Sequence, residues 1–340
     1  MNETYGTDRV IDPSGALPQP AAVLDASDPL RPDEFAISVE KLCLDATSFG
    51  NIRRDCEADP TAMAARVMEI VGQRGKMHNP VTDSGGVALG TVTEVGPEYI
   101  DPPAVGDRIV TLASLTLTPL RLDEVLELDP DSAQIAVRGT AYVFNSAPWG
   151  RLPDDLPEAT ALEVYDVYGA GSHVERLAGP GDTVCVMGAG HAGKLAMAAA
   201  REVTEGGTVI GIDADPAAIG LVQDLGLCDI GLAADLRDPV GTRDRLAEAG
   251  APEADLTVVV VSSTGCEPAA ILATAPGGTV LFFSMATSFQ TAALTADGIG
   301  RDVRMLVGSG FTPDRGAWSL DLVRRSEPLR KALGIERAAP

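Results

Sequence analysis

The residues with the clearest chemical potential lie in the second half of the chain, where three glycines follow a short apolar run. Gly188, Gly190 and Gly193 have the spacing G-x-G-x-x-G, and an alanine-rich segment suited to a helix follows them. The next apolar run, residues 208–212, ends at Asp213. In such a unit the first glycine turns the chain, the second admits a pyrophosphate to the backbone, and the third lets helix pack on strand. This arrangement favours a dinucleotide site over a purely structural glycine turn.

The same unit predicts how the dinucleotide is contacted. An acidic residue at the end of the second strand accepts hydrogen bonds from a ribose diol, so Asp213 favours NAD, with NADP still possible. His191 and Ala192 stand at the start of the helix, whose N-terminus attracts an anion; His191 either contacts a phosphate or faces solvent. Ligands bind at the carboxyl ends of parallel strands. We therefore expect further contacts from Ser262, Ser263 and Ser284 near the nicotinamide and from Gly308 and Ser309 near the ribose.

Composition narrows the class of protein. The 340 residues suffice for two domains with proper cores, and the formal charge of −23 disfavours nucleic acid or an anionic membrane as partner. The five cysteines are scattered without a C-x-x-C pair, so neither a disulfide framework nor a zinc ribbon is expected. The N-terminus is polar and no apolar run has a membrane-spanning length, which argues against a signal peptide or a membrane span. A reduced, cytoplasmic location is expected.

The pattern of apolar residues predicts an α/β chain with two domains. Residues 1–30 have the composition of an irregular leader along a surface; strands are expected over residues 34–40, 88–95, 108–111 and 134–143, with one helix at 59–75 capped by Asp59 or Thr61. A helix from residue 159 leads into regular βα alternation, which is typical of a doubly wound parallel sheet. The predicted division is a β-rich domain over 1–160, a Rossmann domain over 161–312, and a C-terminal helical segment over 313–340 that packs back at the domain junction.

Two strand motifs extend this interpretation. Gly90-Thr-Val-Thr-Glu-Val-Gly96 and residues 105–110 look like landmarks of the medium-chain dehydrogenase/reductase superfamily, which the chain resembles over most of its length. That resemblance implies a GroES-like catalytic domain before the Rossmann domain. The strings at 41–49, 74–86 and 162–170 are more particular and resemble the L-erythro-3,5-diaminohexanoate dehydrogenase family of lysine fermentation. The resemblance implies NAD(P)-dependent oxidative deamination of a β-amino acid, giving 5-amino-3-oxohexanoate and ammonia.

The positions that hold catalytic zinc in alcohol dehydrogenases of this superfamily carry other residues here. Aligning the strand landmarks places Asp45, Gly86 and a position near Glu163 where those enzymes have Cys, His and Cys. Without the histidine and the thiolates a tetrahedral zinc site is not expected, and we predict no metal. Asp45 with Glu163 or Asp166 instead favours a cationic substrate, because carboxylates stabilise the iminium that an amine becomes when it loses hydride. The alternative is that Asp45 caps a helix starting at residue 46.

The remaining candidates are polar residues near Asp45 and in the loop at 74–86. Thr47 occupies the place of the alcohol enzymes' Ser/Thr proton relay. His78 has the pKa range of a general base near neutrality, although a lone histidine is as often structural. Arg74 and Lys76 are candidates for binding the substrate carboxylate, or else they satisfy the carbonyls that end a helix. The amides and hydroxyls expected to hold the second amino group or the carboxamide are Asn79, Thr82 and Ser84.

Two other functions stay open at this stage. One is a zinc-free, NADPH-dependent quinone or enoyl reductase, which needs a flat apolar pocket. The other is a redox sensor that binds the dinucleotide without turnover. The expected partner is a small amino acid substrate, and the apolar strand at 305–308 is expected to join two copies into a homodimer along the edge of the Rossmann sheet.

Overall fold

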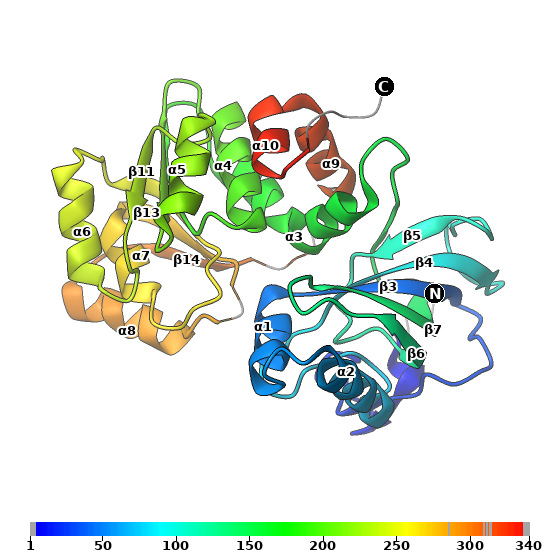
Figure 1. Cartoon of the computed structure of the whole chain (residues 1–340). Helices are drawn as coiled ribbons and strands as arrows, with labels where there is room; N and C mark the ends of the chain where they lie inside the picture. Colours follow the sequence, from blue (N-terminus) through cyan, green and yellow to red (C-terminus); the bar gives the residue numbers. More distant parts are fainter. Residues whose placement is uncertain (1–4, 285, 309, 311, 313–314, 336–340) are drawn as a thin grey trace. The chain divides into compact units, whose positions relative to one another are not determined.

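The computed structural model describes residues 5–284, 286–308, 310, 312 and 315–335 (Figure 1). The chain forms two compact units, Met1–Asp166 and Val167–Pro340. The division therefore falls six residues after the predicted boundary (166 against 160), within a helix rather than before it. Each unit has its own sheet and its own buried apolar cluster.

Unit 1 is built on a six-stranded antiparallel sheet in the order β6-β7-β3-β4-β5-β8. This confirms the predicted β-rich domain. β6 was not predicted, because half of its residues are charged; it lies at the sheet edge, where charges discourage pairing with another chain. The strands are β3 (Glu34–Leu44), β4 (Gly86–Val95), β5 (Arg108–Thr111), β6 (Leu120–Glu127), β7 (Gln134–Phe144) and β8 (Trp149–Arg151).

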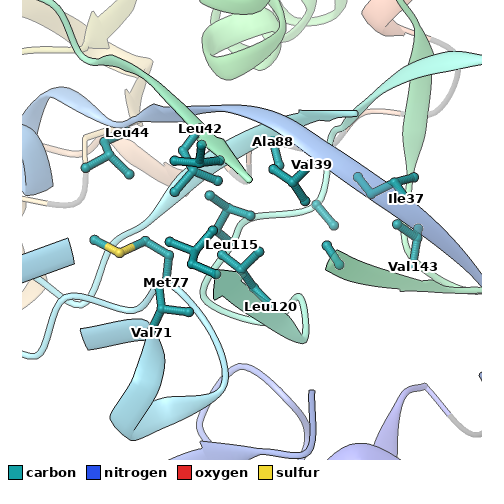
Figure 2. Packing of buried hydrophobic residues seen from close by; sticks show 14 of the residues in the cluster. Ile37, Val39, Leu42, Leu44, Val71, Met77, Ala88, Leu115, Leu120 and Val143 are labelled. Atoms are coloured by element: carbon teal, nitrogen blue, oxygen red, sulfur yellow. The ribbon is translucent and has the colours of Figure 1, made fainter. Parts of the chain in front are cut away.

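A break in the pairing of β3 decides which of its side chains are buried together. Ile37 and Val39 point into the core, and strict alternation would place Lys41 there next. The register instead shifts between Val39 and Lys41, so that Leu42 and Leu44 enter the core (Figure 2). They pack with residues of helix α2 (Pro60–Arg74) and of the following loop, among them Val71 and Met77.

Two short helices follow β3, and both begin at an aspartate. Asp59 caps α2, as predicted, with its Oδ1 accepting from the Ala62 amide at 2.7 Å. Asp45 caps α1 (Ala46–Asp55), so the alternative stated for this residue is confirmed. Gly75 ends α2 with φ 63°, and a Cβ there would lie 2.0 Å from the Leu24 carbonyl oxygen. Only glycine fits this close approach between the helix end and the leader.

The leader is held against the sheet by buried cations rather than by apolar contacts alone. It forms η1 (Thr7–Arg9), β1 (Val10–Asp12) and β2 (Val23–Leu24), and the two strands pair. Arg9 is completely buried; its Nη2 lies 2.6 Å from Glu34 Oε2 and its Cζ 3.9 Å from the centre of the Tyr142 ring. A buried charge needs such pairing to offset its desolvation.

Helix α3 (Glu158–Leu177) begins in unit 1 and ends in unit 2, with non-helical backbone at Val167. Its first turns are tied to the sheet of unit 1. Glu158 accepts from Lys41 at 2.6 Å and from Arg108 at 2.7 Å, and the Tyr165 hydroxyl donates to the Arg151 carbonyl at 2.7 Å. These contacts fix the positions of Glu163 and Asp166, which lie on the same helical segment.

Unit 2 is a parallel sheet in the order β11-β10-β9-β12-β13-β14, which is the predicted doubly wound arrangement (Figure 1). The strands are β9 (Thr183–Met187), β10 (Thr208–Asp213), β11 (Ile230–Ala233), β12 (Ala254–Val259), β13 (Thr274–Phe282) and β14 (Arg304–Val307). The helices between them are α4 (His191–Val203), α5 (Pro216–Asp224), α6 (Pro239–Glu248), α7 (Glu267–Ala273) and α8 (Phe289–Ile299).

The C-terminal helical segment predicted over residues 313–340 contains two helices within its described residues. α9 (Arg315–Arg325) ends before Ser326, whose Oγ accepts from the Leu329 amide and starts α10 (Glu327–Ala332). A proline at the start of α10 favours this break, since it fits the first turn of a helix and not its interior. Both helices pack against α4 in unit 2. No helix of the described residues is long and apolar enough to cross a membrane.

Candidate active site

The three glycines after β9 have the separate roles expected of a dinucleotide-binding turn. Gly188 has φ 118°, which an L side chain rarely adopts. A Cβ on Gly193 would lie 1.8 Å from the Gly188 carbonyl oxygen, so helix and strand pack too closely there for a side chain. A Cβ on Gly190 would meet no atom of the protein within 4 Å. The backbone is thus open at the middle glycine, where a phosphate would approach.

Asp213 lies beside this turn, at the carboxyl end of β10. Its Oδ2 accepts from the Ala189 amide at 2.7 Å, and its Oδ1 accepts from the Asp215 amide at 2.9 Å. Gly190 precedes α4 without a side-chain cap, so the helix N-terminus that starts at His191 and Ala192 is left to an outside anion. The open backbone, the uncapped helix and the carboxylate together fit a bound NAD or NADP.

The other predicted cofactor residues follow neighbouring strands of the same sheet. Ser262 and Ser263 come just after β12 and are exposed; Ser284 follows β13, where its Oγ accepts from the Ala286 amide at 3.1 Å. Because β9, β12 and β13 are parallel neighbours, these segments meet at the edge that carries the glycine turn. Gly308 follows β14 and packs against Phe283. Ser309 lies outside the described residues.

A carboxylate with one engaged and one unengaged oxygen lies at the end of β3 in unit 1. Asp45 Oδ1 accepts from the amides of Thr47 at 3.0 Å and Ser48 at 2.9 Å, and from the Ser84 hydroxyl at 3.0 Å. Asp45 Oδ2 is buried and has no hydrogen-bond partner among the described residues. Burial raises the pKa of Asp45, and the hydrogen bonds to Oδ1 oppose that rise. A buried oxygen of this kind is expected to receive a donor from a ligand or a water.

Two further carboxylates act on the same region. Burial, the Asp45 carboxylate and the Glu163 carboxylate raise the pKa of Asp166 to about 8. Burial and the same three carboxylates raise the pKa of the Cys43 thiol well above its usual range. Asp45, Glu163 and Asp166 therefore lie close enough to influence one another's environment, whereas the sequence paired Asp45 with either Glu163 or Asp166; we call the three residues the acidic cluster. Like charges this close disfavour one another's ionisation, and a cation between them removes that penalty.

Zinc does not fit the positions that hold it in alcohol dehydrogenases. Gly86 pairs with Leu44 across the sheet with φ 114°, and a Cβ there would lie 2.0 Å from the Cys43 carbonyl oxygen. No ligand side chain can therefore stand at that position without moving the backbone. No three His, Cys, Asp or Glu of the described residues are arranged to hold a metal ion. The absence of zinc stays a prediction.

The loop before β4 is docked on helix α1 by polar side chains. Asn79 donates to the Asn51 side chain at 2.9 Å, and Ser84, which bonds Asp45, also bonds Thr82 at 2.8 Å. The structure thus joins the predicted residue Asn79 to Asn51 of α1, and it joins Ser84, with Thr82, to the Asp45 cap that precedes Thr47. Asn51 was not predicted; its burial in α1 depends on the fold and leaves no signal in the sequence.

His78 belongs to this loop and is buried. Its Nε2 lies 3.1 Å from Asp83 Oδ1, whereas its Nδ1 is buried without a partner among the described residues. Burial first, then the charges of Lys76 and Arg74, lower the pKa of His78, and Asp83 acts in the opposite direction. The ring is therefore neutral near pH 7, as a proton acceptor must be. Asp83 was not predicted.

Arg74 and Lys76 have structural partners in place of the predicted substrate carboxylate. Lys76 is completely buried and donates to the carbonyls of Pro18 and Gln19 at 2.8 and 2.9 Å. Arg74 donates to the carbonyls of Ala22 at 3.3 Å and His78 at 2.8 Å. Both cations hold the leader and the loop in place, and we do not include either of them among the substrate-binding residues. The helix-end alternative was also wrong in its partners, because these carbonyls belong to the leader and the loop.

Comparison with known proteins agrees with this geometry. A family profile described as the L-erythro-3,5-diaminohexanoate dehydrogenase N-terminal domain matches residues 8–153. L-erythro-3,5-diaminohexanoate dehydrogenase of Acetoanaerobium sticklandii is 40% identical over 96% of both chains, and that of Fusobacterium nucleatum is 39% identical over 96% of both. Among solved structures, a mycobacterial protein in complex with NADPH is 18% identical with a TM-score of 0.55, covering 91% of this chain and 88% of that one. Alcohol dehydrogenase from Thermus sp. ATN1 is 18% identical with a TM-score of 0.55, covering 90% and 86%.

This chain has the same class of fold as these solved structures, an antiparallel sheet unit followed by a parallel-sheet unit. The solved structures show this fold alone. Within that class, the identity to the curated relatives over nearly the whole chain is decisive. The chain belongs to the L-erythro-3,5-diaminohexanoate dehydrogenase family.

The glycine turn makes a prediction about cofactor binding. Gly190→Ala places a methyl group in open space, so we expect an unchanged melting temperature but about tenfold weaker dinucleotide binding, because the methyl occupies the approach of the pyrophosphate. Gly193→Ala should instead destabilise unit 2 through its clash with Gly188. Gly220→Ala, within α5 and also without neighbours within 4 Å, is the control for adding a methyl group. Calorimetric titration with NAD measures the effect, and equal affinity in Gly190→Ala and Gly220→Ala would contradict it.

The acidic cluster makes a prediction about stability. A carboxylate whose pKa is about 8 when folded and 3.8 when unfolded keeps its proton in the folded state over that interval, so stability falls as pH rises from 3.8 to 8. Asp166→Asn removes this dependence. We expect the variant to gain stability over the wild type at pH 8.5 and to gain much less at pH 4.5, measured by urea denaturation. A gain that is the same at both pH values would show that Asp166 is not protonated in the folded protein.

Proposed function

We propose that the protein catalyses NAD(P)-dependent oxidative deamination of L-erythro-3,5-diaminohexanoate to 5-amino-3-oxohexanoate and ammonia. The names of the curated relatives support this reaction. The observation that carries it in this chain is the acidic cluster: Asp45 has a buried oxygen with no hydrogen-bond partner among the described residues, and burial and the neighbouring carboxylates raise the pKa of Asp166 to about 8. Such a site is complementary to a cationic nitrogen compound.

The chain's own residues account for the charge in this reaction. The glycine turn and Asp213 would hold the dinucleotide, whose oxidised nicotinamide accepts the hydride. Asp45 and Asp166 hold the substrate ammonium, and the same carboxylates stabilise the iminium formed when hydride leaves the amine-bearing carbon. His78 takes the proton that the ammonium loses, and Thr47 is a second candidate for handling it. Water then adds to the iminium carbon, and the C–N bond breaks to release ammonia.

The preference for NAD over NADP rests on Asp213. Its carboxylate lies at the end of β10 and beside the glycine turn, where the ribose of the adenosine is expected. A negative group there accepts hydrogen bonds from a 2′-hydroxyl and repels a 2′-phosphate. We propose NAD as the preferred cofactor.

A quinone or enoyl reductase finds less support. Its flat substrate needs apolar walls, whereas the acidic cluster brings three carboxylates to the end of β3 and the start of α3. A sensor that binds the dinucleotide without turnover does not require that cluster. We further propose that the enzyme acts in lysine degradation in the cytoplasm, which agrees with five free cysteines.

The assay that tests the function follows the reduction of NAD or NADP by L-erythro-3,5-diaminohexanoate. A parallel assay follows the oxidation of NADPH by a quinone. Asp45→Asn keeps a helix-capping side chain but loses the charge, so we expect a normal fold and about a 100-fold fall in kcat/KM. Asp59→Asn makes the same change at the exposed cap of α2 and is the matched control. His78→Gln should lower kcat by a similar factor.

The pH dependence of the same assay gives an independent check. A cationic substrate prefers ionised Asp166, so kcat/KM should rise as pH rises through about 8, and Asp166→Asn should lose that rise. Full activity in both Asp45→Asn and His78→Gln would contradict the assignment of these two residues to the active site. Turnover of a quinone with NADPH and none of the amine would remove the proposed reaction.

We also propose a homodimer that forms along β14. This strand ends the sheet of unit 2, and its Leu306 and Val307 are 39% and 68% exposed. An apolar sheet edge of this kind pairs readily with a second copy. Sedimentation equilibrium should give twice the 35.2 kDa of one chain, and Val307→Lys should give one chain. Val240→Lys, at an exposed apolar position of α6, should leave the dimer intact, and a monomeric wild type would refute the proposal.

A further inference from the structure

The two nitrogens of His78 have different environments. Nε2 lies 3.1 Å from Asp83 Oδ1, and Nδ1 is buried without a partner among the described residues. A carboxylate only accepts hydrogen bonds, so in the neutral ring Nε2 carries the hydrogen and donates it. Nδ1 then has a lone pair. The side chain of His78 is 6% exposed and that of Asp83 is 80% exposed, so the carboxylate reaches the ring from the protein surface.

The backbone of the loop brings these two residues together. Asn79 donates its amide to the Ser84 carbonyl at 3.0 Å, and Asp83 donates its amide to the Asn79 carbonyl at 2.9 Å. Asp83 adopts φ 52°, in the left-handed region that few residues other than glycine favour. The loop is thereby closed, and Asn79 attaches it to α1 through Asn51 at 2.9 Å. This geometry aims the residue at position 83 back at the ring of His78.

The charged groups around the ring work against its protonation. Burial lowers the pKa of the ring most, the cations Lys76 and Arg74 of the same loop region lower it further, and Asp83 acts in the opposite direction. A neutral ring can exist as either of two tautomers, and the choice between them depends on which nitrogen has an acceptor. Asp83 is the acceptor that the structure provides.

We propose that Asp83 is a positioning residue: its carboxylate holds His78 as the Nε2–H tautomer and leaves the Nδ1 lone pair as the atom that receives the proton. The proposal rests on the proposed function in so far as that proton comes from the substrate ammonium. In this step the ammonium N–H bond breaks and an Nδ1–H bond forms. The positive charge moves onto an imidazolium whose other N–H faces Asp83, and the electron count does not change.

The tautomer is measurable without any substrate. The chain has three histidines, so ¹⁵N-labelled histidine in the full-length protein gives three ring spin systems, and His78→Gln assigns the one in question. Asp83→Gly suits the left-handed backbone and removes the acceptor. Asp83→Asn keeps an acceptor oxygen and loses the charge. Asp101→Gly replaces another aspartate with positive φ, 51°, in the same unit, and it is the matched control.

We expect the Nε2–H tautomer in the wild type, Asp83→Asn and Asp101→Gly, and a mixture of tautomers in Asp83→Gly. The pKa of His78 should fall further in Asp83→Gly, because the group that raises it is gone. In turnover, kcat should fall roughly tenfold in Asp83→Gly with little change in KM, less than the 10²- to 10⁴-fold effect of removing a general base, and Asp83→Asn should recover part of it.

An Nδ1–H tautomer in the wild type would overturn the proposal whatever the substrate is. So would an Nε2–H tautomer that stays unchanged in Asp83→Gly. An unchanged kcat in Asp83→Gly despite a changed tautomer would overturn the positioning role. Failure of the proposed function is distinguishable from either result, since it appears as a wild type that does not oxidise 3,5-diaminohexanoate while the ring signals stay as expected.

Discussion

The site of unit 1 depends on one carboxylate oxygen. Asp45 Oδ1 accepts three hydrogen bonds, two from the first turn of α1 and one from the Ser84 hydroxyl. These bonds fix the start of the helix and attach to it the loop that carries His78. They also orient the carboxylate, so that its other oxygen is buried without a donor from the described part of the chain. The same residue thus organises the local fold and supplies an unbalanced negative charge.

Asp45 differs from the buried cations Arg9 and Lys76 of unit 1, because its Oδ2 has no hydrogen-bond partner among the described residues. Arg9 is paired with Glu34 and with backbone carbonyls, and Lys76 donates to two carbonyls of the leader. Those groups offset their desolvation within the protein, which is how a structural charge is expected to behave. Burial and the carboxylates of Asp45 and Glu163 instead raise the pKa of Asp166 to about 8, and burial together with all three carboxylates raises the pKa of the Cys43 thiol. The ammonium of the proposed substrate would supply a hydrogen-bond donor to this Asp45 oxygen.

Unit 2 shows how much of a cofactor site follows from short-range rules. The three glycines were assigned separate roles from their spacing alone, and the backbone agrees at each position: positive φ at Gly188, open space at Gly190, and close packing at Gly193. Asp213 lies beside the turn because parallel strands bring their carboxyl ends to one edge. The positions of the glycine turn and of Asp213 depend only on the pairing of neighbouring strands, so the sequence pattern was sufficient to predict them.

The sequence by itself determined the two-domain α/β class, the glycine turn and the strands with clear periodicity, and it predicted Asp45 beside Glu163 or Asp166. Only the tertiary structure decided that Lys76 and Arg74 bind the leader, that Asp83 reaches His78, and that β3 changes register before Leu42. The physical reason is the range of the interactions. Apolar periodicity and glycine geometry are encoded within a few neighbouring residues, whereas the partner of a long polar side chain or the place of a bulge depends on segments that meet only when the chain is folded.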